Sequence, residues 1–119
     1  MKENVIKTKS FAFALRIVKL YQYLQTKKKE FVLSKQLLRS GTAIGALIRE
    51  AEQAESNADF IHKMAIALKE ANETDYWVDL SFQSGYLEET AYNSIRQDLL
   101  ELLKLLTSII KTSKQNRNK

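Results

Sequence analysis

Apolar side chains recur every three or four residues in four separate stretches of the chain, and short polar segments separate these stretches. That spacing is typical of amphipathic helices that bury one face. Because the connecting segments are short, successive helices are expected to be antiparallel neighbours. The pattern therefore predicts one all-α domain over residues 1–119, an antiparallel up-down-up-down four-helix bundle. Its helices are expected at about residues 8–27, 35–54, 58–84 and 89–113, with a frayed basic tail at 114–119.

The first predicted helix carries two apolar stripes, although packing into a bundle core requires only one. One stripe consists of Phe13, Ile17, Leu20 and Leu24, and the other of Phe11, Ala14, Leu15, Val18 and Tyr21. The last helix likewise has two leucines, Leu100 and Leu105, beside its main stripe. Surplus apolar surface on a bundle usually marks an interface. We therefore expect a homo-oligomer.

Two glycines, Gly41 and Gly45, lie four residues apart inside the second predicted helix. A glycine inside a helix costs about 1 kcal/mol relative to alanine, so the pair needs a compensating role. Close approach of a neighbouring helix supplies one. The charged residues Arg39, Arg49 and Glu50 beside them exclude the membrane form of this small-residue motif.

Polar residues next to the predicted helices indicate where the helices begin and end. Ser34 is a suitable N-cap for the second helix. Ser56 followed by Asp59 approximates a capping box for the third helix. Gly85 is placed to end that helix, because glycine is the preferred residue just beyond a helix C-terminus.

Composition narrows the class of protein. The chain has no proline, no cysteine and three glycines, which disfavours a turn-rich sheet protein and excludes disulfides and thiolate metal sites. No stretch is long and apolar enough to span a membrane, and no signal peptide is evident at the start. We therefore expect a cytoplasmic protein.

Charge is distributed unevenly around the net value of +5. Residues 1–39 contain ten basic side chains and two acidic ones, whereas residues 50–101 contain twelve acidic and three basic ones. Basic ends suit an acidic partner such as RNA or DNA, although solvated helix faces would give the same pattern. The candidate phosphate contacts are Lys9, Arg16, Lys19, Lys27, Lys28, Lys29, Lys35, Lys111 and Lys114.

Catalytic chemistry has few candidates. The chain has one histidine, His62, so the Glu-x-x-His pairs of a di-iron bundle cannot be assembled. No cysteine is present, and no serine has a second histidine to orient it as a nucleophile. Glu73 is expected to pair with Arg39 or Arg49 in a structural role. We therefore expect no enzyme activity, no cofactor and no metal site.

Three segments carry a resemblance to a known family. Leu37–Ala51, Asp59–Thr74 and the corner Ser84–Leu87 resemble the four-helix-bundle family of 23S rRNA intervening-sequence proteins, and the similarity extends over nearly the whole chain. Many members of the family have an Asn-Ile-Ala-Glu-Gly run where this chain has Ala46–Glu50.

The resemblance implies a homopentameric ring and no catalytic residues. Some relatives are accessory proteins of diversity-generating retroelements, whose basic surfaces are thought to engage nucleic acid and a reverse transcriptase. Two hypotheses follow. The chain is either a non-enzymatic module that binds nucleic acid or a ribonucleoprotein, or a homo-oligomeric protein-interaction scaffold without nucleic-acid affinity.

Overall fold

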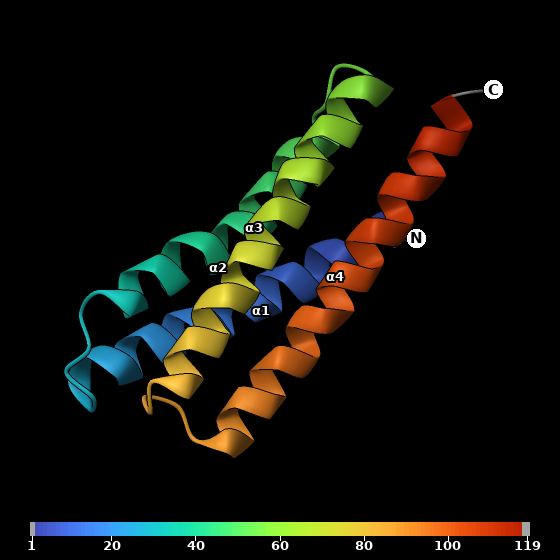
Figure 1. Cartoon of the computed structure of the whole chain (residues 1–119). Helices are drawn as coiled ribbons and strands as arrows, with labels where there is room; N and C mark the ends of the chain where they lie inside the picture. Colours follow the sequence, from blue (N-terminus) through green and yellow to red (C-terminus); the bar gives the residue numbers. More distant parts are fainter. Residues whose placement is uncertain (1, 118–119) are drawn as a thin grey trace.

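A computed structural model describes residues 2–117 and has the predicted class of fold, a four-helix bundle (Figure 1). The helices are α1 (Lys2–Thr26), α2 (Leu33–Glu52), α3 (Asn57–Gln83) and α4 (Glu89–Arg117). Two boundaries differ from the sequence prediction. Helix α1 begins about two turns earlier than expected, and α4 continues through the part of the predicted frayed tail that lies within the described residues.

Each helix packs antiparallel against two neighbours, so that the contacts form a closed cycle α1–α2–α3–α4–α1. The contact between α1 and α4 is the sparsest of the four. The bundle is elongated, with extents of 51 × 21 × 20 Å. The start of α1 and the end of α4 lie at one end of it, and the α1–α2 corner lies at the other (Figure 1). No helix in the described part of the chain is apolar over a bilayer-spanning length.

One of the two stripes of α1 faces the core. Phe13, Ile17 and Leu24 are buried there, together with Leu37 and Ile44 of α2. From α3 and α4 the core receives mainly Met64, Ala67, Ala71, Val78, Leu99, Leu102 and Leu106. A buried hydroxyl pair joins α3 to α2, in which Thr74 Oγ1 donates to Ser40 Oγ at 3.0 Å.

The two glycines of α2 face α1, as predicted. A Cβ atom on Gly41 would lie 2.8 Å from Cγ1 of Ile17, and one on Gly45 would lie 3.4 Å from the backbone oxygen of Ser10. The absence of a side chain at Gly41 therefore sets the separation between α1 and α2.

Helix α3 has the ends that the sequence predicts. Ser56 Oγ accepts the backbone N–H of Asp59 at 3.0 Å, which caps the N-terminus. At the other end, Gly85 has φ = 87°, and the N–H groups of Gly85 and Tyr86 donate to the carbonyls of Phe82 and Ser81. This hydrogen-bond pattern is the Schellman motif.

The prediction that Ser34 caps α2 is wrong. Ser34 lies within the first turn, and Val32 is the N-cap residue, with no side-chain cap bond. The carboxylate of Glu30 performs the capping instead, because it accepts N–H bonds from Val32 (3.1 Å), Leu33 (2.9 Å) and Ser34 (2.7 Å). Ser34 Oγ donates back to the carbonyl of Glu30 at 2.9 Å.

Candidate nucleic-acid interface

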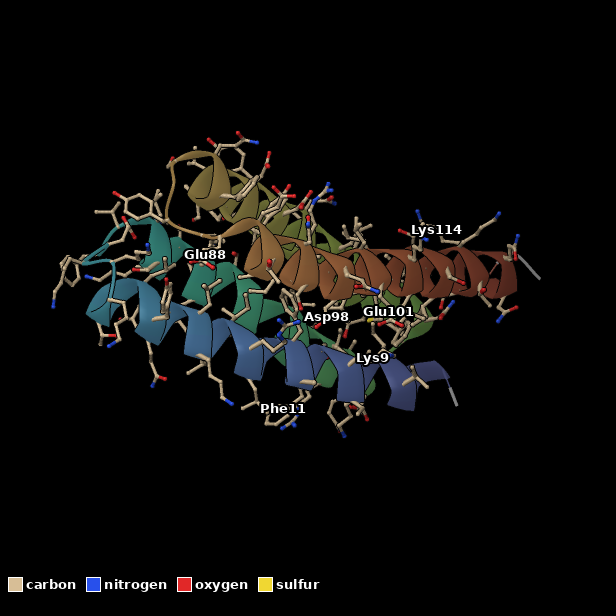
Figure 2. The ribbon with its side chains drawn as sticks, turned by 90° about the horizontal axis from the view of Figure 1, so that it is seen from below. Lys9, Phe11, Glu88, Asp98, Glu101 and Lys114 are labelled. Atoms are coloured by element: carbon tan, nitrogen blue, oxygen red, sulfur yellow. The ribbon has the colours of Figure 1, made fainter. Side chains whose placement is uncertain are left out.

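Two of the candidate phosphate contacts hold α1 against α4. Lys9 Nζ lies 3.2 Å from the carboxylate of Glu101 (Figure 2). Arg16 forms a 2.6 Å ion pair with Asp98. Arg16 also donates to Ser94 Oγ at 2.9 Å. Because acidic side chains of the same chain neutralise Lys9 and Arg16, these two residues are poor phosphate contacts.

Lys19 lies further along the same side of α1. It lines a hollow of about 670 Å³ between α1 and the start of α4, together with Arg16, Tyr23 and Glu88. The floor of this hollow is apolar, formed by residues such as Leu20 and Ile95. Two cationic side chains, Arg16 and Lys19, and one carboxylate, Glu88, line the hollow. It is therefore less basic than the sequence of α1 suggests.

The structure brings four candidates together at the α1–α2 corner. Lys27, Lys28 and Lys29 form the turn between the helices, Lys35 lies in the first turns of α2, and all four are exposed. Within the described part of the chain, no carboxylate pairs with any of them. We refer to residues 27–35, which carry these four lysines, as the basic corner.

Glu30 lies within the basic corner but directs its charge inward. Its side chain is only 8% exposed. Burial alone would raise the pKa of Glu30, but the three N–H bonds of α2 and the hydroxyl of Ser34 lower it below the ordinary value. The corner therefore displays its four ammonium groups while its own carboxylate stays bound to the helix N-terminus.

The remaining candidates, Lys111 and Lys114, lie in the last turns of α4, at the opposite end of the bundle from the basic corner. Figure 2 shows Lys114 at this end. Both are exposed. Lys7, which shares that end, is paired with Glu52 at 3.2 Å. The candidates thus fall into two separate clusters with ion-paired residues between them, so they do not form one continuous face.

Other charged residues have structural partners. Arg39 forms ion pairs with Glu70 and Glu73, as expected for Glu73. The indole N–H of Trp77, at 3.0 Å, and the guanidinium of Arg39 hold the pKa of Glu73 below its ordinary value. His62 is exposed. Among the described residues, no three His, Asp or Glu side chains gather as a metal site would require.

Apolar side chains remain exposed in several places among the described residues, including Leu100 of α4 (39%). The second stripe of α1 points away from the core, with Phe11 49%, Leu15 52% and Val18 37% exposed. Figure 2 shows Phe11 on the outer side of α1. Arg49 of α2 lies 5.0 Å above the ring of Phe11. We refer to Phe11, Leu15 and Val18 as the outer stripe.

A further exposed apolar pair lies in the basic corner itself, where Phe31 is 52% and Val32 70% exposed. Sequence reasoning missed this pair. The available signal was that both apolar residues follow the lysines and belong to no helical stripe.

Taken together, the features above define a four-helix bundle with a basic corner and an open apolar stripe. A family model described as 23S rRNA-intervening sequence protein matches residues 2–108, so the chain belongs to that family. A solved structure from Bacteroides thetaiotaomicron VPI-5482, described as a protein of unknown function from the S23 ribosomal protein family, is 61% identical. That likeness has a TM-score of 0.92 and covers 93% of this chain and 99% of the other. No curated protein matches the sequence.

Proposed function

We propose that this protein is a non-enzymatic binding module that engages nucleic acid through its basic corner. The observation that carries the proposal is the inward turn of Glu30, which leaves Lys27, Lys28, Lys29 and Lys35 exposed without an ion-pair partner in the described structure. Ammonium groups gathered in this way attract a phosphate backbone, because binding releases its condensed counterions.

The backbone of the corner supports the proposal. Lys29 has φ = 54°, a left-handed conformation that glycine adopts more easily. A side chain there costs about 1–2 kcal/mol. The N–H of Glu30 donates to the carbonyl of Leu24 at 2.9 Å and helps to hold this turn. The chain therefore keeps a lysine where the backbone alone would favour glycine.

Lysine contacts of this kind recognise phosphates and carry no direct information about base sequence. Binding is therefore expected to tolerate changes of sequence and to weaken steeply as salt rises. The test is a titration of labelled RNA and DNA at about 50 and 150 mM salt, a range over which phosphate contacts lose much of their affinity. Replacement of Lys27, Lys28 and Lys29 by Gln should lower the affinity and reduce the slope of log K against log salt by about two to three.

A matched control removes the same charge at the opposite end of the bundle. Lys104, Lys111 and Lys114 are exposed on α4, and their replacement by Gln changes the net charge by the same amount. Because the proposal places phosphate binding at the basic corner and not at this second cluster, we expect this variant to bind almost as tightly as the wild type. Equal losses in the two variants would show that only net charge matters, and undetectable wild-type binding at the lower salt would overturn the proposal.

A second candidate function rests on the outer stripe of α1. The side chains of Phe11, Leu15 and Val18 are each more than one-third exposed on a helix whose other face is buried in the core. Exposed apolar side chains in a row are typical of an interface between subunits. The alternative is therefore a homo-oligomeric protein-interaction scaffold, and the family resemblance suggests a pentamer. An oligomer would also repeat the basic corner and strengthen nucleic-acid binding by multivalency.

A further inference from the structure

We infer that Phe31 is a base-stacking platform, which makes unpaired, single-stranded nucleic acid the preferred ligand of the basic corner. This inference rests on the proposed function and specifies its ligand. Phe31 is 52% exposed, and the sequence places it two residues after Lys29 and four residues before Lys35. It therefore lies where a nucleic-acid backbone held by those lysines would present its bases.

Hydrogen bonds of Glu30 hold the backbone around Phe31 in place. Glu30 accepts hydrogen bonds from the N–H groups of Val32, Leu33 and Ser34, and its own N–H is bound to Leu24. These bonds fix the backbone on both sides of Phe31. A ring carried on a fixed backbone loses little conformational freedom when a base stacks on it, so more of the stacking energy appears as affinity.

Stacking on Phe31 requires the face of a base. In a duplex those faces are covered by neighbouring base pairs, whereas in a single strand they are accessible. Aromatic rings stack with every type of base, so the preference for single strands does not imply a preference for sequence. The lysines supply the salt-dependent part of the affinity, and the ring supplies a part that depends little on salt.

Other occupants fit the same surface less well. A membrane surface is bound in proportion to the apolar area inserted, and Phe31 and Val32 are only two adjacent side chains. A second copy of the chain would have to bring together the lysines of two basic corners, which repel one another. The charge of the lysines therefore favours a polyanion, and the exposed ring of Phe31 favours one whose bases can stack.

The experiment compares wild-type protein with Phe31→Ala and Phe31→Trp. The probes are fluorescein-labelled oligo(dT) and oligo(U) of about 20 nucleotides, long enough to span a single-strand site, and a hairpin duplex of equal charge. Phe31→Ala should weaken binding to the single strands at least about fivefold, leave the salt slope unchanged and leave duplex binding unaltered. Phe31→Trp should retain the affinity, and oligonucleotide should quench the fluorescence that this variant adds to that of Trp77.

Tyr76→Ala is the matched control, since Tyr76 is 60% exposed on α3 but is not part of the basic corner. It should bind all three probes like the wild type, and circular dichroism should show that every variant is folded.

The outcomes separate the two proposals. If wild-type protein binds none of the probes, the proposed function itself is overturned. If it binds them and Phe31→Ala has the wild-type affinity for single strands, only the platform is overturned. The platform is also overturned if the Ala substitution instead reduces binding to vesicles of phosphatidylglycerol and phosphatidylcholine, or lowers the oligomeric mass.

Discussion

Gly41 and Gly45 lie on the same face of α2, yet they meet different atoms of α1. The position of a Cβ on Gly41 falls 2.8 Å from Cγ1 and 2.9 Å from Cγ2 of Ile17. Both atoms branch from Cβ of a fully buried residue, so they cannot rotate away freely. A Cβ on Gly45 would lie at ordinary contact distance, 3.4 Å, from Ser10. Only Gly41 is therefore required by the close approach of the two helices.

Alanine substitutions should distinguish the two glycines. Gly41→Ala is expected to lower the free energy of unfolding by about 1–3 kcal/mol, because the methyl group overpacks against Ile17. Gly45→Ala should be neutral or stabilising by up to about 1 kcal/mol, since alanine is the better helix former. Urea denaturation followed by circular dichroism measures both values. An unchanged midpoint for Gly41→Ala would show that α1 can move away at little cost.

At the scale of the helices, the sequence was informative wherever local spacing determines the outcome. The four helices, the Ser56 cap and the Gly85 turn all follow from residues within a few positions of one another. Local spacing does not determine which stripe of α1 faces the core. Both stripes have helical periodicity, and only packing against α2 and α4 selects one. The ion pairs of Lys9 and Arg16 could not be predicted from local spacing either, because their partners lie 92 and 82 residues away along the chain.

Helix α2 shows how one side chain can change the role of its neighbours. The carboxylate of Glu30 accepts the N–H groups of Val32, Leu33 and Ser34 at the start of α2. Ser34 is therefore not needed as the cap and lies inside the first turn. A carboxylate also interacts favourably with the positive N-terminal end of the helix dipole. The start of α2 therefore depends on the ionised form of Glu30.

Glu30→Gln tests this dependence. The amide is neutral and offers fewer acceptor sites to the three N–H groups, so the free energy of unfolding at neutral pH should fall by about 1–2 kcal/mol. The folded-state pKa of Glu30 lies below its ordinary value of 4.5. Its contribution to stability is therefore complete above the ordinary pKa and is lost as the pH falls through the folded-state value.

The difference in stability between wild type and Glu30→Gln should accordingly shrink between neutral pH and about pH 3. Denaturant titrations at several pH values measure it. Glu55→Gln is the control, because Glu55 is exposed and has no ion pair in the described structure. A difference that stays constant with pH would contradict capping by the ionised carboxylate.

At the scale of the whole molecule, the bundle has two surfaces of different chemistry on α1 and the corner that follows it. The outer stripe runs along the middle of α1, and the basic corner lies beyond the end of that helix. Contact between copies through the stripe would leave the corners at the ends of the bundles exposed. Assembly and nucleic-acid binding can therefore be tested separately.

The outer stripe predicts self-association. Multi-angle light scattering of the wild type should give a multiple of the 13.7 kDa chain mass, about fivefold according to the family resemblance. Leu15→Glu places a charge at the centre of the stripe, where burial against another subunit would be costly, and should reduce the mass toward that of the monomer. The variant should keep its helical circular dichroism, because Leu15 contributes little to the core and is 52% exposed. Tyr76→Glu, on an exposed residue of α3, should leave the mass unchanged. A wild type that is monomeric at micromolar concentration, or an oligomer that tolerates Leu15→Glu, would remove the stripe as the site of assembly.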